Sequence, residues 1–354
     1  MFGTYEADLR VIGVGGGGGN ALRELRRLGT ARVARRAANT DRQALAEHPD
    51  EERLVLGPRA TRGLGAGGRP SVGYAAAQES RTELQEVVAE ADLVFLAAGL
   101  GGGTGTGATP LIAHLARDAG ALTVAVVTLP FAFEGGRRRV YAEQGLAALK
   151  EQTDCLIVVP NDRLLLAEGG EEPTFLEAFA RADRVLADAV RGISDLVVQP
   201  GLVNLDFADV RAVLTGGGRA VMGIGVGRGA DRALAAIGSA TRSPLLADDS
   251  FEGARGVLLQ FTIDPGVSLS AIHQAAERVH AMVDDDAEIL FGVAGDPNLE
   301  SEVHVTLIAS GLPHPDPAAV LSPARRLARI PGLEQLTPAE VVLARPRRRS
   351  ALGQ

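Results

Sequence analysis

The run GGGTGTG occupies residues 101–107, shortly after the apolar run LVFLAA at residues 93–98. Continuous apolar runs of this length are typical of strands buried on both faces of a parallel sheet. We predict a helix after the glycines, opening at Thr109 and Pro110, because proline fits the first turn of a helix. Such a loop presents backbone amides and threonine hydroxyls near a positive helix end, which favours the binding of a polyphosphate.

Two further glycine-rich segments have the same character. Five glycines at residues 15–19 lie between an apolar run at 9–14 and a predicted helix at 20–28, and GLGAGG lies at residues 63–68. The first contains the pattern GxGxxG with Asp41 downstream, which by itself also fits a Rossmann domain that binds a dinucleotide. A nicotinamide-dependent oxidoreductase needs one phosphate loop of this kind, whereas several such loops indicate several phosphates.

The chain lacks the lysine of the usual phosphate-binding loop. Its only lysine is Lys150, away from every glycine run, and the pattern GxxxxGK[ST] is absent. We therefore exclude the P-loop class and expect backbone amides, arginine and a metal ion to offset the charge of the phosphates.

Composition narrows the function further. Of 354 residues, 36 are Lys or Arg and 44 are Asp or Glu, so the net charge of −8 argues against a nucleic-acid partner. The single cysteine, Cys155, cannot form an internal disulfide, and the histidines show no metal-ligand spacing. The N-terminus does not resemble a signal peptide, and the uncharged segment 93–116 is interrupted by Gly, Thr and Pro. We expect a cytoplasmic protein without a transmembrane segment.

Further apolar runs extend the predicted sheet. Residues 122–128 and 155–159 are predicted to be buried strands, and residues 32–38 a poorer one because they contain Arg35 and Arg36. Strands that alternate with helices predict an α/β fold with a Rossmann-type parallel sheet, covered on both faces.

A long helix joins this sheet to a second α/β unit. Apolar residues recur at steps of three and four between Thr174 and Pro200. After it we predict strands at residues 219–225, 256–263, 287–293 and 302–309, and helices at residues 231–242 and 268–283. The predicted organisation is a nucleotide-binding domain at 1–173, a central helix at 174–200, a second domain at 201–312 and a tail at 313–354.

The tail contains seven of the 18 prolines of the chain, so we predict that it is extended or mobile. It ends in an arginine cluster at residues 345–349. A solvated end is favoured over a contact with acidic lipid or a partner.

Taken together, these motifs resemble the tubulin/FtsZ family of GTPases. The matching stretches follow the family order over roughly residues 9–312, and they are VIGVGGGGGNAL at 11–22, NTDRQAL at 39–45, GLGAGGRPSVG at 63–73, GGGTGTG at 101–107, LPFAFEGGRRRVYAEQGLAAL at 129–149, LIVVPNDRLL at 156–165, AFARADRVLADAVRGISDLV at 178–197, GLVNLDFADVR at 201–211, AVMGIGVGRGADRA at 220–233 and SPLL at 243–246. The resemblance implies a tubulin-like fold that binds GTP or GDP with Mg²⁺ and polymerises head to tail. It also implies GTP hydrolysis and a role in the division ring of bacterial cytokinesis, at the septum.

The resemblance implies roles for the glycine-rich segments and for their neighbours. The phosphates would be wrapped by Gly15, Gly16, Gly17, Gly18, Gly19, Ala66, Gly67, Gly68, Gly101, Gly102, Gly103, Thr104, Gly105, Thr106 and Gly107. Asn20, Asn39 and Asp41 would line the nucleotide pocket. Glu134 would hold the ribose, and Arg138 would reach the terminal phosphate.

The base would be recognised from the long helix. Phe179 would stack on guanine, while the Asp183 carboxylate would accept hydrogen bonds from N1–H and the exocyclic amine. Phe179 also fits the apolar stripe of the helix and could be a core residue. Asn161 would contact the base or the sugar.

The segment NLDFAD holds the proposed catalytic residues Asn204, Asp206 and Asp209. Two acids three residues apart at a helix start are equally typical of helix capping. The resemblance implies instead that they position the attacking water and a metal ion on the nucleotide of the next subunit. A contact of this kind does not close on itself and generates a filament.

The chain also departs from the family pattern. Its tail has only a weak similarity, RIPGL at 329–333, to the family peptide that docks membrane tethers. In addition, Ala294 and Gly295 stand where bulkier residues are usual in the family. Tethers and regulators of a division ring are therefore possible partners whose identity stays open. The alternative function is that of a divergent relative that forms filaments with little hydrolysis.

Overall fold

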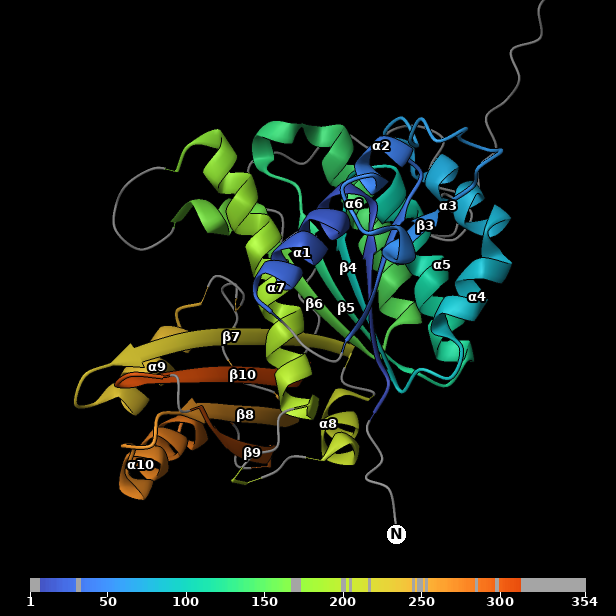
Figure 1. The fold of residues 1–354 in the computed structure, drawn as a ribbon. Coiled ribbons are helices and arrows are strands. Elements are labelled where there is room, and N and C mark those ends of the chain that lie inside the picture. The colour runs from blue at the N-terminus through green and yellow to red at the C-terminus, as the bar shows by residue number, and fades with distance from the viewer. Residues whose placement is uncertain are drawn as a thin grey trace, which may run out of the picture.

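The computed structural model describes residues 7–29, 33–166, 173–198, 202–203, 206–215, 218–243, 246, 251, 254–283, 286–296 and 299–312. Its strands form one ten-stranded sheet in the order β3-β2-β1-β4-β5-β6-β7-β10-β8-β9 (Figure 1). The strand bounds are β1 Leu9–Val14, β2 Ala34–Asn39, β3 Arg53–Val55, β4 Leu93–Gly99, β5 Leu122–Leu129, β6 Cys155–Pro160, β7 Gly218–Arg228, β8 Gly256–Ile263, β9 Glu288–Gly295 and β10 Glu302–Leu312. The strands from β1 to β7 pair in parallel, whereas β10 is antiparallel to both β7 and β8.

The α-helices cover the sheet on both faces. Their bounds are α1 Gly15–Arg27, α2 Arg42–Leu45, α3 Pro70–Glu79, α4 Arg81–Val88, α5 Thr104–Asp118, α6 Gly136–Gln152, α7 Phe175–Val198, α8 Phe207–Leu214, α9 Arg232–Ala240 and α10 Leu269–His280. One core contains side chains of α1, α7 and α8, and the core on the opposite face contains those of α3, α4, α5 and α6. A third core lies between α9, α10 and the strands β7 to β10. All eight residues of β5 are buried, as expected for a strand covered on both faces.

The predicted strands and the long helix are present in the structure. The α/β fold with a second α/β unit is therefore confirmed, and β7 continues the first unit's sheet by pairing with β6. The domain boundaries remain predictions, and the tail at residues 313–354 lies outside the described residues. Within the described part of the chain, no helix combines the length and apolar character needed to cross a bilayer.

Two predicted helix starts were wrong. The helix α5 begins at Thr104 rather than at Thr109, so Pro110 lies inside the helix, and α1 begins at Gly15 rather than at Asn20. Glycine has a low helix propensity, which moved both predictions downstream. In the structure Gly18 of α1 and Gly105 and Gly107 of α5 are needed in these first turns because neighbouring backbone approaches them too closely for a side chain.

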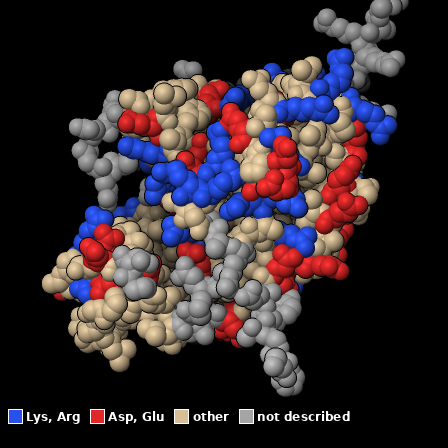
Figure 2. Space-filling model, viewed as in Figure 1, with Lys and Arg blue, Asp and Glu red and all other residues tan. Residues whose placement is uncertain are grey.

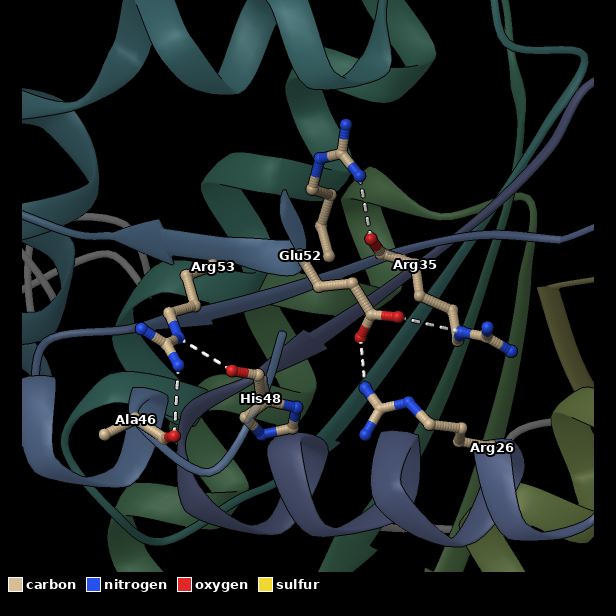
Figure 3. A network of polar contacts seen from close by, with 7 residues as sticks. Arg26, Arg35, Ala46, His48, Glu52 and Arg53 are labelled. Atoms are coloured by element: carbon tan, nitrogen blue, oxygen red, sulfur yellow. Dashed lines mark hydrogen bonds and ion pairs between the residues drawn. The ribbon is translucent and has the colours of Figure 1, made fainter. Parts of the chain in front are cut away.

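The poor strand predicted around Arg35 is β2, and a buried carboxylate explains its arginines. Glu52 lies between Arg35 and Arg26 of α1 and is paired with both, the Arg35 Nε atom lying 3.2 Å from the Glu52 carboxylate (Figure 3). Glu52 is 7% exposed, and the next residue, Arg53, donates to the carbonyl oxygen of His48 at 2.7 Å. Charge pairing thus ties β2, α1 and the segment before β3 together where apolar packing would be usual.

Arginine side chains also gather on the face formed by α1 and α7, as Figure 2 shows. Carboxylates on the same helices lie within ion-pair distance of them. The pairs are Arg27 with Glu24 at 2.9 Å, Arg184 with Asp188 at 3.4 Å and Arg191 with Asp195 at 3.4 Å. These three arginines are therefore balanced locally by carboxylates of their own helices.

Candidate functional site

The first turns of several helices meet at the carboxyl edge of the parallel strands. A Cβ atom on Gly15 of α1 would lie 3.0 Å from the amide nitrogen of Gly105 in α5. A Cβ atom on Gly73 of α3 would lie 2.3 Å from the carbonyl oxygen of Gly103. One on Gly101 would lie 2.8 Å from the Arg138 carbonyl oxygen in the first turn of α6. The N-termini of α1, α3, α5 and α6 therefore converge, and each carries a partial positive charge.

This convergence lies where ligands bind in open α/β sheets. The strand β1 is flanked by β2 on one side and β4 on the other, so the connections after β1 and β4 leave the edge in opposite directions. Backbone amides at such a point attract phosphate groups. The arrangement is that of an α/β protein that binds a nucleotide polyphosphate.

The glycines at this edge fall into two groups. A Cβ atom on Gly18, Gly105 or Gly107 would lie 2.0–2.4 Å from a backbone carbonyl oxygen of another segment. By contrast, a Cβ atom on Gly16 or Gly102 would meet nothing within 4 Å. The first group is required by the packing of the protein itself, whereas Gly16 and Gly102, like Gly68, have open space beside them that a ligand could use.

The two predicted threonines shape the loop. The Thr106 hydroxyl accepts a hydrogen bond from the Gly101 amide at 2.8 Å, and Thr104 shares one with Thr40 at 2.7 Å. Both hydroxyls are buried and engaged within the protein. They hold residues 101–107 in a compact turn whose remaining amides can face a ligand.

The helices α1 and α7 bring Asn20, predicted to line the nucleotide pocket, together with Asp183, predicted to recognise the base. Asn20 Nδ2 donates to Asp183 Oδ2 at 2.9 Å. Burial raises the pKa of the Asp183 carboxyl to about 6, opposed by this hydrogen bond and by the charge of Arg23. The partly buried Asp183 carboxylate accepts one hydrogen bond from Asn20, so it can still accept hydrogen bonds from a base that carries two N–H donors.

Phe179 lies in a cluster of phenylalanines that the sequence reasoning missed. Its ring centroid is 5.1 Å from that of Phe131 and 4.9 Å from that of Phe175, while Phe133 stacks on Phe131 at 5.0 Å. Phe133 is 59% exposed and Phe175 is 66% exposed. The PFAF sequence at residues 130–133 was the available signal: Phe133 in it is exposed to solvent, whereas Phe131, on which it stacks, is buried.

Glu134 and Arg138 interact with each other. They form an ion pair, and Glu134 Oε1 also accepts the Phe131 amide hydrogen at 2.9 Å. Asn161 is 6% exposed, and its Oδ1 atom has no hydrogen-bond partner among the described residues. An unpartnered buried acceptor at this edge suits a ligand donor.

A pocket of about 150 Å³ lies beside the first turn of α1, between α1, α2 and the end of β2. It is lined by Asn20 and Asn39, and also by Arg23, Glu47 and His48, which the sequence reasoning missed. His48 Nε2 would lie 3.1 Å from a Cβ atom on Gly19, so the ring packs on the glycine turn. Burial, with Arg26 and Arg23 nearby, lowers the pKa of His48.

Asp41 is placed differently from its neighbours. Its carboxylate accepts the amide hydrogens of Gln43 at 2.8 Å and Ala44 at 3.3 Å, so it caps α2. It is not among the residues that line the pocket. In this structure its carboxylate is used by the protein itself.

Asp206 and Asp209 lie at the opposite end of the molecule, at the start of α8 (Figure 1). They form a capping box, in which the Asp209 amide donates to Asp206 at 2.8 Å and the Asp206 amide donates to Asp209 at 3.1 Å. The segment before them is tied to β9, because the Leu202 amide donates to the Val293 carbonyl oxygen at 2.6 Å. Asn204 lies outside the described residues. Within one chain, the acids and the glycine-rich edge are therefore not brought together.

Comparisons with known proteins agree with this architecture. Residues 8–167 match the GTPase domain of the Tubulin/FtsZ family, and residues 218–313 match the C-terminal domain of the FtsZ family. An empty FtsZ dimer from M. jannaschii is similar at 40% identity and a TM-score of 0.82, over 87% of this chain and 89% of that one.

Two CetZ structures from Haloferax volcanii are also similar. CetZ1, a GDP-bound monomer, matches at 25% identity and a TM-score of 0.73, over 86% of this chain and 94% of that one. CetZ2, a GTPγS-bound protofilament, shares the fold at 22% identity and a TM-score of 0.71, over 85% and 92%.

The chain belongs to the tubulin/FtsZ family, a family of filament-forming GTPases, and binds guanine nucleotide. The predicted family and enzyme class are thereby confirmed. The match to a GTPase domain decides against the nicotinamide-dependent alternative, whose GxGxxG pattern this edge shares.

Proposed function

We propose that this protein polymerises head to tail and hydrolyses GTP at the contact between successive copies, as the division-ring GTPase of a bacterium. The observation that carries the proposal is the separation of the glycine-rich edge from Asp206 and Asp209 at opposite ends of one molecule. If a second copy stacked its Asp206 and Asp209 end on the glycine-rich end of the first, its acids would lie over the nucleotide of the first copy.

Exposed apolar side chains at both ends support this stacking. Leu64, which is 78% exposed, lies at the glycine-rich end, where it forms a bridge with Asp41. At the other end, Leu202 is 77% exposed and Leu269 at the start of α10 is 85% exposed. Large apolar side chains that face solvent at two opposite ends suit a heterologous contact that repeats.

Within one copy, the phosphates would bind the open amides of Gly16 and Gly102 and the turn at residues 66–68. Guanine would lie between α1 and α7, with Phe179 on its face and the Asp183 carboxylate accepting its two N–H donors. Adenine lacks this donor pair, which favours guanine. Glu134, Arg138 and Asn161 would contact the sugar and phosphates.

We propose Mg²⁺ as the accompanying ion. Among the residues that the structure describes, no group of three or more His, Cys, Asp or Glu could form a protein cage for a metal ion. The donors present fit instead an ion held mainly by phosphate oxygens and water, with Asp206 or Asp209 of the next copy beside it. When bound, the ion would offset the negative charge of the phosphates.

The bacterial division role and the septal, cytoplasmic location rest on the resemblance, and the similar FtsZ structure comes from M. jannaschii. Docking to membrane tethers or regulators depends on residues 313–354, outside the described part. The second candidate is a divergent filament-forming relative with little hydrolysis; Ala294 and Gly295 in β9 would mark such a relative by altered assembly, whereas the complete glycine-rich loops favour retained catalysis.

The test is to measure pelleting and phosphate release against protein concentration, with GTP and with GDP. We expect the rate per molecule to rise above a threshold concentration at which GTP-dependent pelleting begins. Pelleting without phosphate release would establish the second candidate. A rate per molecule that is independent of concentration would contradict the shared site.

A further inference from the structure

Arg69 breaks a local rule of helix structure at the glycine-rich edge. It is the N-cap residue of α3, with Pro70 in the first turn, and its side chain makes no capping hydrogen bond. Ser, Thr, Asp and Asn are preferred there because their side chains accept the free helix amides, which a guanidinium cannot do. A cation at this end also opposes the helix dipole.

The backbone of Arg69 is held firmly against the site. Its amide nitrogen and carbonyl oxygen would lie 2.9 Å and 3.2 Å from a Cβ atom on Gly103, in the turn before α5. Its guanidinium nitrogens lie 3.9–4.0 Å from the Cβ position of Gly67, within the turn predicted to wrap phosphate. The side chain therefore starts at the convergence of helix N-termini and turns back over the loop at residues 66–68.

The charge of Arg69 is also not compensated within the protein. Across the described part of the chain, its exposed guanidinium has no hydrogen bond and no ion pair, whereas Arg138 is paired with Glu134. A free cation among positive helix ends is unfavourable unless an anion joins it. The anion that this edge is built for is the phosphate chain of the nucleotide.

The fold also indicates which phosphate is nearest. Asn20 and Asp183, at the proposed base, lie on α1 and α7, which share a core on one face of the sheet. The helix α3 packs in the core on the other face. A phosphate chain that crosses the edge from α1 toward α3 has its terminal group closest to α3.

We propose that Arg69 binds the terminal phosphate of GTP in its own chain and so discriminates GTP from GDP. The inference rests on the proposed function and deepens it, because it assigns a phosphate-binding side chain beyond the glycines and threonines that the resemblance implies.

The test compares Arg69→Asn with wild type and with Arg62→Gln, which removes an exposed arginine from the same segment. Affinities for GTP and GDP are measured below the assembly threshold, and the melting temperature is measured without nucleotide. For Arg69→Asn we expect GTP to bind about tenfold more weakly or worse, since a charge-assisted contact is lost. GDP affinity should change less than about threefold on the same scale. The melting temperature should hold or rise because asparagine caps helices well.

Each other outcome is decisive. Equal losses for GTP and GDP, or a lower melting temperature that explains the weaker binding, would overturn the assignment. Unchanged GTP affinity with impaired pelleting would show that Arg69 contacts the next copy instead. If wild type and Arg62→Gln fail to bind GTP at all, the proposed function itself fails, and this is distinguishable from a loss confined to Arg69→Asn.

Discussion

Asp183 shows how one buried carboxyl can set both the specificity and the pH response of the site. Its partner Asn20 donates only one hydrogen bond to it, and burial raises its pKa to about 6. Above that pH the carboxylate can accept both N–H donors of guanine, and below it the protonated acid loses much of this capacity.

We therefore predict that GTP affinity falls as the pH is lowered through about 6, by up to about tenfold between pH 7.5 and 5. Asp183→Asn should bind GTP more weakly at pH 7.5 and show a shallower pH dependence, measured by equilibrium titration of both proteins over the same range. Identical pH dependences would contradict the role of this carboxylate.

The same substitution has an opposite effect on folding. Because the pKa of Asp183 is higher in the folded state than in the unfolded chain, the folded state binds more protons, and its stability falls as the pH rises from about 4 to 6. Asp183→Asn should therefore raise the nucleotide-free melting temperature at pH 7, so weaker GTP binding cannot be attributed to unfolding.

At the scale of an element, the glycine motif at the start of α5 contains glycines with two different roles, one in packing and one beside open space. A Cβ atom on Gly107 would lie 2.0 Å from the Pro70 carbonyl oxygen, whereas one on Gly102 would meet nothing within 4 Å. The contact of Gly107 is with backbone, which cannot move aside as a flexible side chain does.

We predict that Gly107→Ala destabilises the protein by about 3 kcal/mol or more, measured by urea unfolding without nucleotide. Gly102→Ala should unfold within about 0.5 kcal/mol of wild type but bind GTP more weakly, because its methyl group would occupy space proposed for phosphate. Equal stabilities for the two variants would refute the packing argument, and unchanged GTP affinity of Gly102→Ala would refute the phosphate contact.

Charge pairing contributes to holding the strand β2, beside its backbone pairing with β1. Glu52 is buried between Arg26 and Arg35, so its removal leaves two partly buried cations facing each other. We expect Glu52→Gln to cost about 2–3 kcal/mol of unfolding free energy. Glu51→Gln is the matched control, because Glu51 is exposed and carries the same charge. If both variants unfold alike, the network does not hold β2.

At the scale of the whole molecule, the capping box of α8 leaves two explanations for its acids. Asp206 and Asp209 cap the helix in the structure, and the proposed function gives them a second use on the next copy. Asparagine separates these uses, because its amide oxygen can still accept the capping hydrogen bond but carries no charge.

We predict that Asp209→Asn keeps GTP binding and thermal stability but loses most of its turnover. Mixed with wild type, it should leave uncleaved each wild-type nucleotide that it covers, because that nucleotide then lacks the acid of the next copy. Arg138→Ala should impair only the nucleotide of its own chain. If Asp209→Asn hydrolyses GTP at the wild-type rate, the catalytic role is contradicted and helix capping is the remaining role of these acids.

Much of the architecture could be read from local patterns. The apolar runs predicted β1, β4, β5 and β6, the helical period predicted α7, and the glycine motifs predicted the family and its nucleotide. Such features depend on residues within a few positions of one another, so a linear pattern carries them.

Contacts between distant segments could not be read in this way. Gly107 needs its hydrogen side chain because Pro70 approaches it, Arg35 is tolerated because Glu52 is buried beside it, and Thr106 turns its hydroxyl to Gly101. Only folding places these partners together, and it also carries Asp206 and Asp209 to the end of the molecule away from the glycines. Local propensity ranks a residue by its own backbone preferences, whereas tertiary packing decides which of its atoms remain open to a ligand.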